Sequence, residues 1–200
     1  MYQKSYLLLA QYYISTVRCA YLCSIIIKIF DMIRIRKANE ADYPAIMDVI
    51  KQALQNVNGY GYLSLAEIRS SELFIPDLSL VAENDEHKIV GHIFLVKVSI
   101  NDTFPSLGLA QIVVAPEYQG LTIGSMLVAQ AHQKAKELGY GSIVSLGCKG
   151  FLSRFGYHTV ADFGIHFPYG VVENQCVIVE LYPGALAKVR GIVSFPLEYL

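Results

Sequence analysis

An apolar run leads through a loop with two glycines into a lysine-bearing amphipathic segment between Gln111 and Tyr140. The apolar run contains Ile112–Val114, and the glycines are Gly120 and Gly124. The first turn of a helix leaves backbone N–H groups unpaired, and the helix dipole makes that end positive. Glycine also lets a large ligand approach the backbone closely. The segment therefore predicts a strand, a turn and a helix that together hold a phosphate group.

The loop differs from two well-known nucleotide-binding loops. It lacks the G-x-x-x-x-G-K-[ST] pattern of a P-loop and the G-x-G-x-x-G fingerprint of a Rossmann domain. It reads IVVAPEYQGLTIGSML, which resembles motif A of the GNAT superfamily of acyl-CoA-dependent N-acetyltransferases. In that family a strand ending in V-x-P-E-Y leads into Q/R-x-x-G-x-G/A, and the matching positions here are residues 119–124.

Three further segments support this resemblance. LSLVAENDEHKIVGHIFL resembles the strand pair that precedes motif A, and SRFGY resembles the R-F-G-F ending of the family. ELYPGAL near the C-terminus resembles a YhbS-like branch. The resemblance runs from about Met32 to the end of the chain and does not cover residues 1–31.

The resemblance implies an acyl-CoA N-acyltransferase fold, an α/β architecture in which helices flank a central mixed β-sheet. It also implies acetyl-CoA as co-substrate, no metal, and direct transfer of the acetyl group to a primary amine of a small molecule or a protein. The amine would enter between the motif A strand and the next strand, where the two separate. The alternative is a catalytically weakened acyl-CoA-binding module of the same fold.

The resemblance assigns acetyl-CoA contacts to the motif A strand and loop. The backbone N–H of Ile112 would stabilise the oxyanion at the thioester carbonyl, and the strand would pair with the pantetheine arm. The loop would hold the pyrophosphate with its N–H groups. The implied contact residues are Ile112, Val113, Val114, Gln119, Gly120, Leu121, Thr122, Ile123, Gly124 and Ser125.

Thr122 departs from the family pattern, which has glycine at that position. A positive φ would strain its β-branched side chain, whereas a helical φ would tolerate threonine and leave its hydroxyl free to bind a phosphate. We expect helical dihedrals, because the following Ile123 also demands ordinary backbone angles.

Leu152 is the second departure. Family members usually place a tyrosine four residues before the glycine corresponding to Gly156, as general acid for the leaving thiolate, and leucine cannot donate a proton. A thiol with a pKa of about 8.5 leaves readily without help, so we expect a slower enzyme or another donor. The other candidate donors are Cys148, Ser153 and Tyr157.

No side chain is assigned as general base. Glu117 is expected to face the phosphate end, and Gln111 and His92 lie on strands that could border the acceptor cleft. We expect His92 to be a packed strand residue, and water to be able to carry the proton. Arg154 is expected to pack at the surface, and the alternative is a position near CoA. Residues 60–63 are expected either to line the acceptor pocket or to close the core.

Hydrophobic periodicity predicts the elements that position this loop. Strands are expected at 32–38, 78–84, 88–100, 107–115, 141–148 and 175–182, followed by a less regular tail. Helices are expected at 40–54 after an Asn39 cap, at 65–74 after a Ser64 cap, from 124 to 139, and at 149–156. The order β-α-α-β-β-β-α-β-α-β predicts one mixed sheet covered by helices on both faces.

Composition limits the class of protein. The chain has 200 residues, of which 54% are hydrophobic and 16% charged, which is typical of a globular domain. A net charge of −1 provides no basic surface for nucleic acid. The cysteines, at positions 19, 23, 148 and 176, have neither zinc-site spacing nor a disulfide pattern, so we expect a cytoplasmic protein without metal. Either a monomer or a homodimer is compatible with the sequence.

Residues 1–31 are apolar and tyrosine-rich, unlike the rest of the chain. Arg18 and Lys28 interrupt the apolar runs below the roughly 18 residues that a membrane-spanning helix needs. We expect an extension outside the fold, followed by one N-acetyltransferase domain over residues 32–200. The alternative is a helix of residues 1–31 that contacts a membrane or a partner protein.

Overall fold

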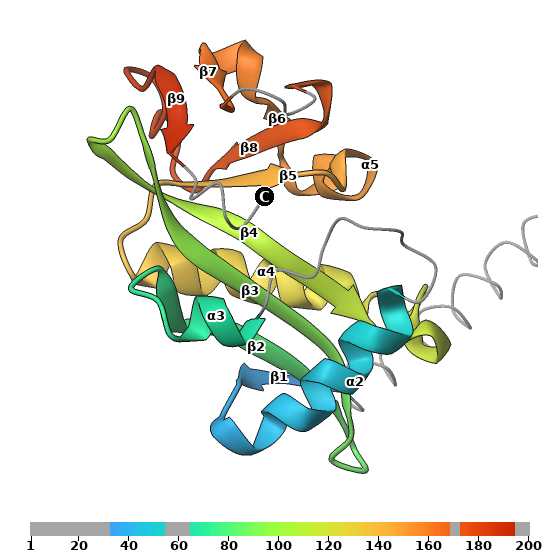
Figure 1. Cartoon of the computed structure of the whole chain (residues 1–200). Helices are drawn as coiled ribbons and strands as arrows, with labels where there is room; N and C mark the ends of the chain where they lie inside the picture. Colours follow the sequence, from blue (N-terminus) through green and yellow to red (C-terminus); the bar gives the residue numbers. More distant parts are fainter. Residues whose placement is uncertain (1–32, 55–64, 169–172, 195–200) are drawn as a thin grey trace, which may run out of the picture.

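The computed structural model describes residues 33–54, 65–168 and 173–194 (Figure 1). Its strands are β1 (Ile33–Lys37), β2 (Phe74–Asn84), β3 (Ile89–Ile100), β4 (Phe104–Val114), β5 (Ser142–Leu146), β6 (His158–Thr159), β7 (Ile165–His166), β8 (Cys176–Glu180) and β9 (Gly191–Ser194). Its α-helices are α2 (Tyr43–Leu54), α3 (Leu65–Arg69), α4 (Ile123–Glu137) and α5 (Lys149–Leu152). The 3-10 turns are η1 (Glu40–Asp42), η2 (Pro116–Tyr118), η3 (Ser153–Phe155), η4 (Val160–Phe163) and η5 (Glu173–Gln175).

The strands form the predicted mixed sheet. Their order is β1-β2-β3-β4-β5-β8-β6, and β9 pairs with both β3 and β7. Neighbours are antiparallel along this path except for β4 and β5, which are parallel. The long strands β2, β3 and β4 form the centre of the sheet, so the motif A strand lies between the antiparallel half and the C-terminal half.

Helices cover both faces of the sheet (Figure 1). Successive strand residues point to opposite faces, and this alternation separates two buried clusters. Phe94 of β3 belongs to the cluster that includes Ile46 and Val49 of α2, whereas the neighbouring Ile93 belongs to the cluster that includes Leu127 of α4. The central strands are therefore buried on both sides and form a rigid base for the loop that follows β4.

The entry to α2 is capped as predicted. The Asn39 side chain accepts a hydrogen bond from the Ala41 N–H (2.9 Å), and the Asp42 carboxylate accepts one from the Asn39 N–H (2.7 Å). The same carboxylate pairs with Arg36 of β1 (2.7 Å). The capping box thus joins the first strand to the first helical segment.

Several predicted bounds differ from the structure: β2 and β4 begin earlier than expected, at Phe74 and Phe104, and the helix expected at 149–156 ends at Leu152 before η3. Two further differences have a clear physical cause. The helix expected at 65–74 ends at Arg69, because the Ser71 hydroxyl donates to the Ile68 carbonyl oxygen (2.7 Å) and the chain then turns into β2. The less regular tail contains β9, whose Val193 pairs with Ile100 of β3. That strand depends on a partner far away in sequence, which local patterns do not reveal.

The predictions for residues 1–31, for the Ser64 cap and for residues 60–63 lie outside the described residues. Among the helices that the structure does describe, none is both long and apolar enough to cross a membrane.

The sheet opens between β4 and β5. These strands pair only through Leu107–Leu109 of β4 and Ile143–Ser145 of β5. Directly after this pairing, Ala110 is an extra residue opposite β3, since Phe94 pairs with Gln111 and Leu95 with Leu109. A bulge of this kind bends its strand. The remainder of β4 therefore has an edge that β5 does not cover.

Candidate active site

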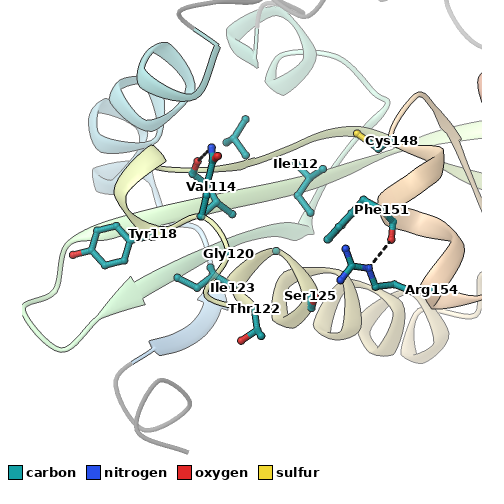
Figure 2. Close-up of a pocket in the computed structure, with 13 residues that line it drawn as sticks. Ile112, Val114, Tyr118, Gly120, Thr122, Ile123, Ser125, Cys148, Phe151 and Arg154 are labelled. Atoms are coloured by element: carbon teal, nitrogen blue, oxygen red, sulfur yellow. Dashed lines mark hydrogen bonds between the residues drawn. The ribbon is translucent and has the colours of Figure 1, made fainter. Parts of the chain in front are cut away.

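A cavity of about 550 Å³ lies where β4, the following loop, the start of α4 and α5 meet (Figure 2). Its lining residues are Ile112, Val113, Val114, Tyr118, Gln119, Gly120, Thr122, Ile123, Gly124, Ser125, Cys148, Phe151 and Arg154. The structure thus brings together the residues predicted to contact acetyl-CoA, except Leu121. Leu121 is 38% exposed and does not line the cavity.

The open edge of β4 presents backbone groups to this cavity. The Ala115 N–H donates to the Val90 carbonyl oxygen of the β3 side (2.9 Å), and hydrogen-bonded pairs alternate along an antiparallel ladder. Val113 therefore faces β3 with its backbone groups, while the N–H groups of Ile112 and Val114 point the other way. The Gln119 side chain agrees with this direction, because its Nε2 reaches the Val114 carbonyl oxygen at 3.0 Å.

The start of α4 adds further donors. The first helical bond runs from the Met126 N–H to the Thr122 carbonyl oxygen (3.0 Å), so the N–H groups of Ile123, Gly124 and Ser125 have no partner within the helix. Among the residues that the structure describes, no side chain caps this end of α4. These N–H groups and the positive end of the helix dipole face the cavity, which makes it suited to an anion.

The expectation that Thr122 has helical dihedrals is wrong. Its φ is 63° and its ψ is −3°, which is the left-handed region. Its hydroxyl donates to the Leu121 carbonyl oxygen (2.6 Å) and is therefore occupied locally. The chain must reverse between η2 and α4, and Gly120 (φ 78°) and Thr122 together make that turn. The family's glycine suits this conformation, so threonine is held there by the surrounding fold at a cost in strain.

Phe151 and Arg154 line the cavity from α5 and η3. The sequence interpretation gave Phe151 no role, and for Arg154 it expected packing at the surface, with a place near CoA as the alternative. A Cβ atom on Gly124 would lie 3.3 Å from Cζ of Phe151, so the ring packs directly on the first turn of α4. The Arg154 guanidinium carbon lies 4.9 Å from the centre of that ring. Cys148, Phe151 and Arg154 are spaced by three residues, and this spacing is the signal that places them on one face of a helical segment.

Leucine at position 152, where the family usually has tyrosine, is a core residue in this structure. Leu152 is completely buried in the cluster on the α4 side and does not line the cavity. Among the other candidate donors, Tyr157 is buried and bonds His132 (3.0 Å), and Ser153 lies outside the lining. Cys148 does line the cavity, and partial burial raises the pKa of its thiol. Cys148 is therefore the candidate donor that this geometry retains.

None of the candidate bases lines the cavity. Glu117 pairs with Lys88 at 3.1 Å. His92 is completely buried, its Nε2 lies 3.0 Å from the Ser79 hydroxyl, and burial lowers its pKa to about 4. His92 Nδ1 and Gln111 Oε1 are buried, and neither makes a hydrogen bond of normal geometry among the described residues. The Gln111 side chain nevertheless lies close enough to His92 to act against the lowering of its pKa. His92 is thus a neutral core residue, as expected.

Comparison with known proteins shows which proteins this chain is similar to. Residues 76–159 match the model of the acetyltransferase (GNAT) domain. The chain is 28% identical over 119 residues to YhbS of Escherichia coli K12, named an uncharacterized N-acetyltransferase, covering 59% of this chain and 71% of that protein. It is 31% identical over 115 residues to YjhQ of the same organism, likewise named an uncharacterized N-acetyltransferase, covering 56% and 63% respectively.

Solved structures show the same fold. The crystal structure of Escherichia coli YhbS in complex with CoA aligns with a TM-score of 0.76 at 22% identity, over 84% of this chain and 92% of that one. A GNAT family acetyltransferase from Brucella melitensis in complex with acetyl-CoA aligns with a TM-score of 0.65 at 26% identity, over 84% and 98%. The split between β4 and β5 and the loop before α4 lie within the residues that match the family model.

Proposed function

This chain carries a GNAT acetyltransferase domain, and from that premise we propose that a primary amine attacks the thioester of acetyl-CoA directly. The N–C bond forms as the C–S bond breaks, and CoA leaves as thiolate. The domain is proposed to comprise residues 32–200. The observation that carries the proposal is that the uncovered edge of β4 and the N-terminal turn of α4 face one cavity.

The backbone of β4 is proposed to orient the reacting end of acetyl-CoA. Because hydrogen-bonded pairs alternate along β3 and β4, the Ile112 N–H lies on the uncovered edge of β4. There it donates a hydrogen bond to the thioester carbonyl oxygen. Val114 lies on the same edge and is available to the pantetheine arm, as an added strand would be. Because the sheet holds this backbone rigidly, the donor needs no rearrangement when negative charge develops on the oxygen.

The loop and α4 are proposed to hold the diphosphate. The donors are the N–H groups at the start of α4, between Ile123 and Ser125. Gly120 leaves the approach open, because no atom of the described residues other than its chain neighbours lies within 4 Å of the position that a Cβ would take. The Gln119 side chain, bonded to the Val114 carbonyl oxygen, links the loop to the strand. The two ends of the site are thereby fixed relative to each other.

Proton transfer is proposed to use water rather than a buried side-chain base. His92 is neutral and outside the cavity, and Glu117 is paired with Lys88. Cys148 is the side chain of the cavity that could protonate the leaving thiolate, but its raised pKa makes it a weak acid. A general acid typically contributes about 10²–10⁴-fold to the rate, so turnover slower than with a tyrosine donor is expected.

The test is release of CoA thiol from acetyl-CoA by the full-length chain across a panel of small amines and amine-bearing peptides. Turnover above the uncatalysed rate with any amine supports the proposal. A Cys148→Ser variant measures the contribution of that thiol. Tight binding of acetyl-CoA without release across the panel would favour the weakened acyl-CoA-binding module, with which the buried Leu152 is consistent.

A further inference from the structure

Arg154 is the one residue with a formal charge among the described residues that line the cavity. Its Nε donates to the Phe151 carbonyl oxygen (3.2 Å), and no carboxylate of the described residues lies within ion-pair distance of it. An arginine whose role was only to pack at the surface would have no favourable partner in a cavity whose other polar groups are unpaired N–H donors. The guanidinium therefore adds positive charge to a site that is already suited to an anion.

Packing places this charge next to the start of α4. The Phe151 ring contacts Gly124 in the first turn, where a Cβ would approach Cζ to 3.3 Å. The guanidinium carbon of Arg154 lies 4.9 Å from the centre of the same ring, and its Nε is tied to the backbone of that residue. Figure 2 shows Phe151 and Arg154 projecting from the α5 side toward the cavity. The ring and the hydrogen bond together hold the guanidinium at the edge of the predicted diphosphate site.

We propose that Arg154 is the counter-charge of the acyl-CoA diphosphate and binds it together with the N–H groups of α4. This inference rests on the proposed function. The N-terminus of a helix supplies roughly half of an elementary charge, whereas a diphosphate carries more than one negative charge. A guanidinium donates two parallel hydrogen bonds to phosphate oxygens, and its Nη groups have no partner among the described residues. The pantetheine arm is neutral and offers no such partner.

Binding of truncated donors by the full-length chain tests the assignment. Calorimetry compares acetyl-CoA, acetyl-dephospho-CoA and S-acetylpantetheine on the wild type, Arg154→Gln, Arg154→Lys and Lys149→Gln. Lys149 is the matched control, because it is a nearby exposed cation at the start of α5 that does not line the cavity. Its Nζ donates instead to Thr159 Oγ1 (3.1 Å) and the Asn174 carbonyl oxygen (3.2 Å). Circular dichroism and melting temperature establish that each variant is folded.

The expected pattern separates the diphosphate from the rest of the donor. Arg154→Gln should weaken the binding of both diphosphate-containing donors about tenfold and leave the binding of S-acetylpantetheine unchanged. Tenfold is the lower end of the range for losing a hydrogen bond to a charged group, as suits an exposed site. Arg154→Lys should show a smaller loss, because lysine keeps the charge without the fork. The wild type should lose affinity for acetyl-CoA more steeply with added salt than Arg154→Gln does. Lys149→Gln should bind all three donors as the wild type does.

Five outcomes would overturn the assignment. A loss seen with acetyl-CoA but absent with acetyl-dephospho-CoA would place Arg154 on the 3′-phosphate instead. An equal loss with S-acetylpantetheine would mean that the substitution disturbs Phe151. An equal loss in Lys149→Gln would mean that overall charge, rather than this contact, is measured. Unchanged binding in Arg154→Gln refutes the contact alone, whereas a wild type that binds no acetyl-CoA refutes the proposed function as well.

Discussion

Replacing Thr122 by glycine tests whether the turn before α4 stores backbone strain. Thr122 has a φ of 63°, a conformation that costs a residue with a side chain about 1–2 kcal/mol relative to glycine. Glycine also loosens the unfolded chain, which offsets about 0.5–1 kcal/mol of that gain. The hydroxyl bond to the Leu121 carbonyl oxygen is exposed and adds little. The net expectation is a gain of about 0.5 kcal/mol in the free energy of unfolding.

Thr122→Ala is the matched control. Alanine keeps the Cβ atom and therefore the left-handed strain, but removes the hydroxyl and the β-branch. The glycine variant should therefore be about 0.5 kcal/mol more stable than the alanine variant, which is about 1–2 °C in melting temperature for a chain of this size. Thermal unfolding of the full-length chain, with urea unfolding as a second measurement, gives both differences.

The reasoning is refuted if the alanine variant melts at or above the glycine variant. That result would mean that position 122 does not hold a positive φ in solution. Acetyl-CoA binding provides a further readout, because glycine adopts the same turn without strain. Thr122→Gly should keep the affinity of the wild type within about twofold, which is less than 0.5 kcal/mol.

Three other substitutions test packing and protonation. Gly124→Ala should weaken acetyl-CoA binding about fivefold in calorimetry, because the added Cβ would lie 3.3 Å from the Phe151 ring. The melting temperature should not fall, because alanine favours the helix. Parallel losses of binding and stability would contradict this. Asp42→Asn should lower the free energy of unfolding at pH 7 by about 1–2 kcal/mol. The pKa of Asp42 is lowered, chiefly by the hydrogen bond from Arg36. This stabilisation is therefore present above the unfolded pKa of about 3.9 and is lost as pH falls. A stability difference from the wild type that stays constant down to pH 2 would argue against the pairing. Burial lowers the pKa of His92 to about 4, so the unfolded state binds a proton that the folded state does not, and stability should fall from pH 6.5 toward pH 4, by about 2 kcal/mol at pH 5. His92→Gln should remove this contribution in urea unfolding measured at pH 5 and 7, and an unchanged pH dependence would refute a neutral buried histidine.

The phosphate-binding part of the site could be predicted because it is local in sequence. A strand, a glycine-bearing turn and a helix start follow one another between Ile112 and Ser125, so their relative placement depends mainly on neighbouring residues. The mixed sheet was likewise predictable from hydrophobic periodicity. The end of the helix at Arg69 and the existence of β9 were not, because the first depends on serine hydroxyls that bond the backbone and the second on pairing with β3.

Which side chains form the wall of the cavity opposite α4 depended on tertiary structure. The sequence alone drew attention to Leu152 as the position of a missing tyrosine, but the rotation of α5 and the following η3 buries Leu152 and turns Phe151 and Arg154 toward the cavity. That rotation is set by packing against the sheet, because a helix of four residues has too few turns for its own periodicity to determine a face.

The sequence by itself therefore determined the order of the elements, the motif A loop and the resemblance to the family, since each is encoded in contiguous residues. The resemblance also implied that the motif A strand and the next strand separate, and it left a place near CoA as the alternative for Arg154. Only the tertiary structure decided that β5 leaves β4 after Leu109, that Thr122 adopts a left-handed turn, and that Arg154 faces the cavity at the start of α4. These features arise where the packing of the whole domain outweighs the local preferences of the chain, which is the physical reason that they could not be predicted from residue patterns.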